Sequence, residues 1–99
     1  MRGEFKTPGG KLVVAEFDVV AGRLIGVRIT GDFVLDPADA LPLIAEALEG
    51  AAADATAFEL EARVFTALPP DAELLGASPR AVAEAVIRGL IGYELGGGV

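Results

Sequence analysis

The segment KTPGGKLV, residues 6–13, places two lysines beside a pair of glycines, a combination that can bind phosphate. A phosphate-binding P-loop requires the pattern G-x-x-x-x-G-K-[ST] between a strand and a helix. In this chain Leu12 stands where the pattern needs a hydroxyl, and the residues after Lys11 alternate as in a strand. The segment is therefore not a P-loop.

The same residues predict a turn that leads into the first strand. Pro8 favours an extended conformation for Thr7, which precedes it. Gly9 and Gly10 can adopt positive φ, so the chain can reverse there and leave Lys11 at the edge of a strand.

Residues for catalysis are scarce in this chain. It has no histidine and no cysteine, so Ser-His or Cys-His nucleophilic catalysis and histidine-based metal sites cannot form within it. Ser78, the single serine, precedes Pro79 and is predicted to cap a helix rather than to act as a nucleophile. We expect no catalytic residue and no metal site.

Three aspartates lie close together in the sequence and could resemble a Mg²⁺ or acid–base cluster: Asp32, Asp36 and Asp39. The interpretation that we favour is that they serve helix starts and solvation. Asp36 can cap a helix whose first residue is Pro37, and Asp39 suits the positive end of the helix dipole.

The composition indicates one domain of 99 residues with one core. The hydrophobic fraction is 53% and the mean hydropathy is +0.52, which is high for so short a chain. Either the chain is an alanine-rich helical protein, which we favour, or it carries an apolar patch for a partner.

The net charge is −7, so we expect neither nucleic acid nor anionic lipid as a partner. Residues 1–28 carry +2 and the remainder −9, so only the N-terminal quarter can attract an anion. The absence of cysteine favours a reducing compartment. No signal peptide or membrane-spanning segment is recognisable, and we expect a cytoplasmic protein.

Alternating apolar residues between positions 11 and 30 predict a β-hairpin. We expect a three-residue loop, Val20-Ala21-Gly22, closed by a bulge, because this register sets Phe17 opposite Ile25 on the core face. A two-residue loop would instead place Asp18 opposite Ile25 on that face. The predicted strands cover residues 11–20 and 24–30.

After the hairpin, a bend at residues 31–33 and a short third strand at Val34-Leu35 are expected. Pro42 then requires either a separate short turn over residues 36–40 or a helix that starts near Leu41, and Gly50 ends that helix.

Two further helices have clear start signals. Thr56 and Glu59 have the spacing of a capping box, and Pro69-Pro70 ends the helix that they open. Residues 71–77 are expected to form an irregular connection, and Ser78-Pro79 to open a last helix that runs to about Ile91. We therefore predict an α+β fold: a small antiparallel sheet, made of the hairpin and the third strand, covered on one face by about three helices. The domain is expected to cover residues 1–99, with an N-terminal arm over 1–10 and a flexible glycine-rich tail over 92–99.

Two motifs in this order resemble a known family. K-x-P-G-G-K-L-V at residues 6–13 precedes the hairpin, and I-x-G-D-F follows it at residues 29–33. Together with the acidic helix starts and the closing S-P helix, they resemble the small subunit of bipartite lipoate-protein ligases. That subunit is similar to the C-terminal accessory domain of single-chain lipoate-protein ligases. The resemblance covers residues 5–91.

The resemblance implies a non-catalytic role in protein lipoylation. In that family a separate catalytic subunit binds ATP with Mg²⁺ and lipoate, forms lipoyl-AMP and transfers lipoyl to an acceptor domain. The small subunit is needed for the activation step. The implied partners are thus the catalytic subunit and, indirectly, lipoyl acceptor domains, and no cofactor is bound by this chain alone.

The matching residues are the candidates that face the partner or the adenylate. Lys6 and Lys11 would help to neutralise nucleotide phosphates, or they would only solvate the strand edge. Phe33 would contact the partner or belong to the core. The alternative function is a stand-alone homo-oligomeric scaffold, or a small-molecule-binding domain, that uses an exposed sheet edge. The complete candidate set is Lys6, Pro8, Gly9, Gly10, Lys11, Gly31, Asp32 and Phe33.

Overall fold

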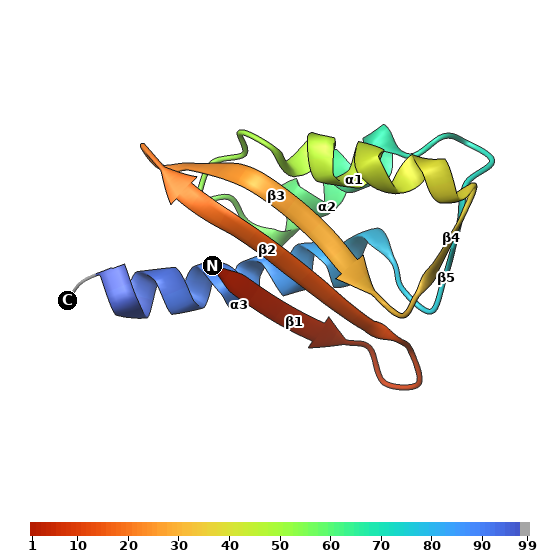
Figure 1. Ribbon diagram of the computed structural model, residues 1–99, viewed down its shortest axis with the longest axis horizontal. Coiled ribbons are helices and arrows are strands. Elements are labelled where there is room, and N and C mark those ends of the chain that lie inside the picture. Colours follow the sequence, from red (N-terminus) through yellow and green to blue (C-terminus); the bar gives the residue numbers. More distant parts are fainter. Residues whose placement is uncertain (98–99) are drawn as a thin grey trace.

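The computed structural model describes the backbone of residues 1–97 and the side chains of residues 1–91. Its main sheet has three antiparallel strands in the order β1 (Arg2–Lys6), β2 (Leu12–Val20) and β3 (Arg23–Gly31). The helices are α1 (Leu41–Leu48), α2 (Ala57–Ala67) and α3 (Pro79–Gly97). All three lie on the same side of the sheet (Figure 1). The predicted α+β class is confirmed.

The predicted third strand exists but does not join the main sheet. It is β4 (Val34–Asp36), which pairs with β5 (Glu73–Leu75) in a separate antiparallel ribbon at one end of the molecule (Figure 1). The third strand of the main sheet is β1. The expected N-terminal arm over residues 1–10 is therefore wrong, and so is the irregular connection over 71–77, because it contains β5.

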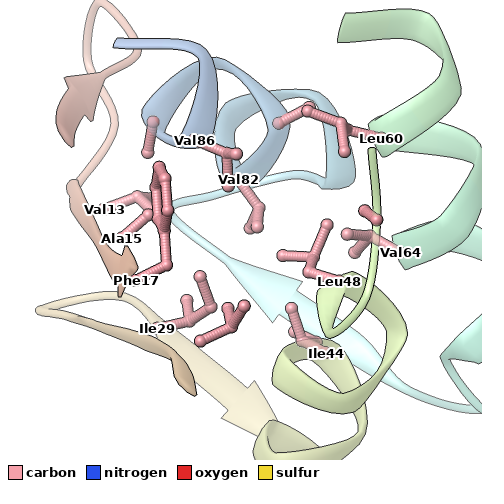
Figure 2. Packing of buried hydrophobic residues seen from close by; sticks show 14 of the residues in the cluster. Val13, Ala15, Phe17, Ile29, Ile44, Leu48, Leu60, Val64, Val82 and Val86 are labelled. Carbon is pink, nitrogen blue, oxygen red and sulfur yellow. The ribbon is translucent and has the colours of Figure 1, made fainter. Parts of the chain in front are cut away.

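One hydrophobic core lies between the sheet and the helices (Figure 2). The sheet contributes alternate side chains of β2 and β3, and each helix contributes the apolar stripe that its spacing predicts. Side chains that meet in this core include Val13, Ala15, Phe17, Ile29, Ile44, Leu48, Leu60, Val64, Val82 and Val86.

The hairpin register differs from the predicted one. The loop has two residues, Ala21 and Gly22, both with positive φ (52° and 75°), which matches the twist of the flanking strands. Asp18 does lie opposite Ile25, but both side chains are exposed on the other face. A bulge at Gly26 (φ 67°) sets two residues of β3 against Phe17 and so restores the core-facing alternation.

The end of α1 is tied to this bulge by a carboxylate. Glu49 accepts hydrogen bonds from the backbone N–H groups of Val27 and Gly26, both at 2.9 Å. These two bonds, with Val27 the larger contribution, lower the pKa of the Glu49 carboxyl below its ordinary value. The backbone of β3 is also joined to this segment, since the Leu24 N–H donates to the Ala51 carbonyl at 2.9 Å.

Strand β1 packs against α3 through glycine. A Cβ on Gly3 would overlap the carbonyl oxygen of Ala85, and a Cβ on Gly89 would lie 2.9 Å from the ring of Phe17. The guanidinium of Arg88 lies 5.2 Å from the centre of the Phe5 ring. The first strand is thus held by the last helix.

Two of the three predicted helix caps are confirmed. Thr56 and Glu59 form a complete capping box, and the Ala81 N–H donates to Ser78 Oγ at 3.1 Å. Asp36, however, caps no helix because it is paired in β4, and the residue before the 3₁₀ turn over Ala38–Ala40 is an extended Pro37. Both alternatives considered around Pro42 are present, since a separate short turn over Ala38–Ala40 precedes α1, which starts at Leu41 with a proline in its first turn.

The predicted end of the last helix near Ile91 is wrong, because α3 continues to Gly97, and the flexibility expected of residues 92–99 stays a prediction. A single glycine inside a helix costs only about 1 kcal/mol, so Gly92 does not end it. Residues 98 and 99 lie outside the described part of the chain. Among residues 1–97 no helix is both long enough and apolar enough to cross a membrane.

Candidate functional site

The predicted turn at residues 7–10 is confirmed and has type II geometry, although it leads into the second strand, β2, and not into the first. The Gly10 N–H donates to the Thr7 carbonyl at 2.7 Å, which closes the turn. Pro8 occupies its second position, and Gly9, with φ 76°, its third, where the backbone requires positive φ. The turn therefore fixes the direction in which Lys6 leaves β1 and Lys11 enters β2.

The second motif lies beside the first. Gly31 is opposite Val13 at the end of β3, and the Asp32 N–H donates to the Leu12 carbonyl at 3.3 Å. A Cβ on Gly31 would overlap that same carbonyl oxygen, and its φ of 150° is one that side chains disfavour. The two sequence motifs are thus parts of one structural unit.

A third segment, which sequence reasoning missed, completes this unit. The Lys11 N–H donates to the carbonyl of Gly76 at 2.8 Å. A shallow hollow of about 240 Å³ separates the turn from residues 76–78, at the start of α3. The available signal was Gly76 between the apolar Leu74-Leu75 pair and the Ser78 cap, but nothing local indicates what that glycine contacts.

The two lysines share a second hollow of about 340 Å³ with Asp32, Gly10 and Leu12. Both lysine side chains are exposed, and within residues 1–91 no ion pair joins either of them to a carboxylate. The arrangement offers two ammonium groups and one carboxylate at the edge of the sheet. Such a site can attract an anion.

Two positions were considered for the side chain of Phe33, in the core or at a surface for a partner, and the structure shows features of both. It is half-buried and packs against the core. It also lines an apolar hollow of about 360 Å³ together with Val34, Leu35 and Leu41. One part of the ring thus stabilises the bend, and another part is accessible from outside.

The part of the chain whose side chains are described provides no metal site. No group of three or more aspartates, glutamates, histidines or cysteines is placed to hold an ion. Asp32, Asp36 and Asp39 do not converge, because Asp36 is held in β4 opposite Glu73.

Comparison with known proteins identifies a similar fold but no similar sequence. No protein-family model and no curated protein matches the sequence. One solved structure does match: a chain in the structure of a bipartite lipoate protein ligase and its E2 lipoyl domain from Thermoplasma acidophilum. The TM-score is 0.70 at 17% identity, and the match covers 87% of this chain and 92% of that one. The chain has the fold of a component of an archaeal lipoylation system.

The resemblance inferred from the two motifs is thereby confirmed at the level of the fold. At 17% identity the match carries no residue roles. The parts assigned to the eight candidate residues remain predictions, although the structure brings both motifs together at one end of the sheet.

Proposed function

We propose that this chain is the non-catalytic accessory subunit of a two-component lipoate-protein ligase. In this role it acts with a catalytic subunit in the ATP-dependent formation of lipoyl-AMP for protein lipoylation. The observation that supports the proposal most directly is the convergence of the KTPGGKLV turn and the GDF bend, in a fold shared with a lipoylation-system component.

In this proposal the chain contributes two positive charges and holds them in place near the nucleotide phosphates. ATP, with Mg²⁺, would bind to the catalytic subunit and supply the adenylyl group. Lys6 and Lys11 would approach the phosphates as point charges, and their placement depends on the type II turn and on the Gly76 carbonyl. Because a preorganised charge needs no rearrangement during the reaction, a rigid turn suits this task.

The absence of catalytic side chains is consistent with this division of labour. The chain has no histidine or cysteine, and its single serine caps α3. Chemistry would therefore come from the partner, and this subunit would complete its site.

The test is lipoate-dependent release of pyrophosphate by the purified catalytic subunit, with and without this chain. We expect release only when both proteins are present, and we expect them to co-elute on gel filtration. Unchanged release in the presence of this chain would overturn the proposal. Concentration-dependent self-association in that case would favour the scaffold alternative.

A further inference from the structure

The ribbon of β4 and β5 has an outward face of unusual composition, which we call the ribbon face: Val34, Asp36, Glu73 and Leu75. The middle pair, Leu35 and Leu74, alternates to the inner side, where Leu35 is buried. Val34 lies directly opposite Leu75, and each residue is 56% exposed. Two large apolar side chains thus stand together in solvent on a short ribbon.

The other half of the ribbon face sets like charges against each other. Asp36 lies directly opposite Glu73, and both residues are exposed. Like charges at directly opposed positions destabilise a strand pair. Among residues 1–91 neither carboxylate takes part in an ion pair. A cationic group from outside the chain would relieve this repulsion.

The outer face of the main sheet differs from the ribbon face in the pairing of its charges. It exposes Val20 and Ile25, but two of its carboxylates are paired within the chain, Glu4 with Arg2 at 2.8 Å and Glu16 with Arg28 at 3.7 Å. The ribbon face instead sets two carboxylates directly opposite each other beside a cross-strand apolar pair.

The ribbon face also adjoins the candidate site. Gly76, which follows Leu75, accepts the Lys11 N–H. Figure 1 shows the ribbon and the turn between β1 and β2 at the same end of the molecule. A protein seated on the ribbon would therefore lie beside the two lysines.

We infer that the ribbon face binds a segment of the catalytic subunit in which an apolar side chain is followed by lysine or arginine. The apolar side chain would cover Val34 and Leu75, and the cation would lie between Asp36 and Glu73. A second copy of this chain fits poorly, because each copy carries a net charge of −7 and would oppose the same carboxylates. The inference rests on the proposed function for the identity of the partner.

Apolar hollows next to the ribbon give such a segment room for further side chains. Leu74 of β5 helps to line one of about 500 Å³, together with Phe65 and Leu68. Val34 helps to line the hollow of about 360 Å³ at Phe33. Phe65 is 70% exposed, so it remains available for contact.

The test measures the affinity of the purified catalytic subunit for ribbon variants and for matched controls. D36K/E73K reverses the charge, and V34T/L75T removes apolar contact while it places a β-branched residue, which suits a strand, at both positions. D18K/E46K makes the same change in net charge on exposed positions of β2 and α1, and I25T removes an exposed apolar residue of β3.

We expect each ribbon variant to raise the dissociation constant by roughly tenfold, and each control to change it by about twofold or less. A milder variant, D36N/E73Q, separates binding from folding. It should raise the thermal midpoint of the free chain, because the like-charge repulsion is gone, and it should still weaken binding.

The outcomes distinguish the two proposals. If the unaltered chain binds and activates the catalytic subunit but the ribbon variants bind equally well, the ribbon inference is overturned and the proposed function stands. If the unaltered chain neither binds nor activates, the proposed function fails and the ribbon inference fails with it.

Discussion

The carboxylate of Glu49 accepts the backbone N–H of Val27 at 2.9 Å, directly beside the bulge of β3. A second bond, from the adjacent Gly26, makes the carboxylate a cap for two backbone groups that the bulge takes out of the ladder. A residue just beyond α1 thus completes the backbone bonding of a strand.

The replacement Glu49→Gln should make the stability of the fold less dependent on pH. Hydrogen bonds lower the pKa of this carboxyl in the folded state. Its stabilising contribution is therefore complete above the pKa of the unfolded chain, about 4.3. It is lost as pH falls through the lower folded value. Urea unfolding at pH 7 should show the variant to be less stable.

The difference between variant and unaltered chain should shrink as pH falls below about 4.3 and vanish below the folded pKa. Glu46→Gln, on the exposed side of α1, serves as the control for removal of a charge. A difference that stays constant from pH 7 to pH 3 would show that the charge of Glu49 has no part in the effect.

Gly3→Ala should separate β1 from α3. The added methyl group would overlap the carbonyl oxygen of Ala85, which belongs to a helix backbone and cannot turn away. We expect a loss of about 1 to 3 kcal/mol in the free energy of unfolding, measured by urea denaturation. Lys6→Ala, an exposed position of the same strand, should cost little, and equal losses in both variants would contradict this account.

Gly31→Ala should disturb the junction of the two motifs. The position combines a φ of 150° with close approach to the Leu12 carbonyl, so a methyl group brings both strain and overlap. We expect about 1 to 3 kcal/mol of destabilisation, with Thr30→Ala as the neighbouring control. Amide exchange of Asp32, whose N–H bonds to Leu12, should accelerate more than that of the core strands.

Lys11→Ala should lower lipoate activation in the reconstituted pair without unfolding this chain. The exposed ammonium group contributes charge, while the structural bond at this position comes from the backbone N–H, which the variant keeps. We expect a decrease of roughly tenfold in the rate of pyrophosphate release, equivalent to about 1.4 kcal/mol. Arg28→Ala removes an exposed cation from β3 as the control, and unchanged adenylation kinetics in Lys11→Ala would exclude this lysine from the mechanism.

Local signals explain which parts of the fold could be predicted. The capping box at Thr56 and the Ser78-Pro79 start depend on residues within one helical turn, and both were found. Strands β1 and β5 are only five and three residues long, too short for a clear periodicity, and the partner of β5 lies far from it in the sequence. The predicted hairpin register was wrong because the bulge at Gly26 shifts the alternation of inward and outward side chains without changing which residues are apolar.

In the candidate site, too, the local structure could be predicted from the sequence and the tertiary contacts could not. The type II turn follows from Pro8 and Gly9 alone. Its contact with Gly76 is tertiary, since the two segments are distant in sequence. The resemblance to a lipoylation component came from motif order, and the shared fold is what the structure adds.

The packing of Gly3 against α3 also determines when the site is assembled during synthesis. The β2–β3 pairing joins residues that are close in the sequence and can form early, but β1 cannot pack against α3 until that helix has left the ribosome. The turn between the two lysines is therefore anchored on both sides only after α3 has been synthesised. A nascent chain would expose its first strand without offering a partner the completed surface.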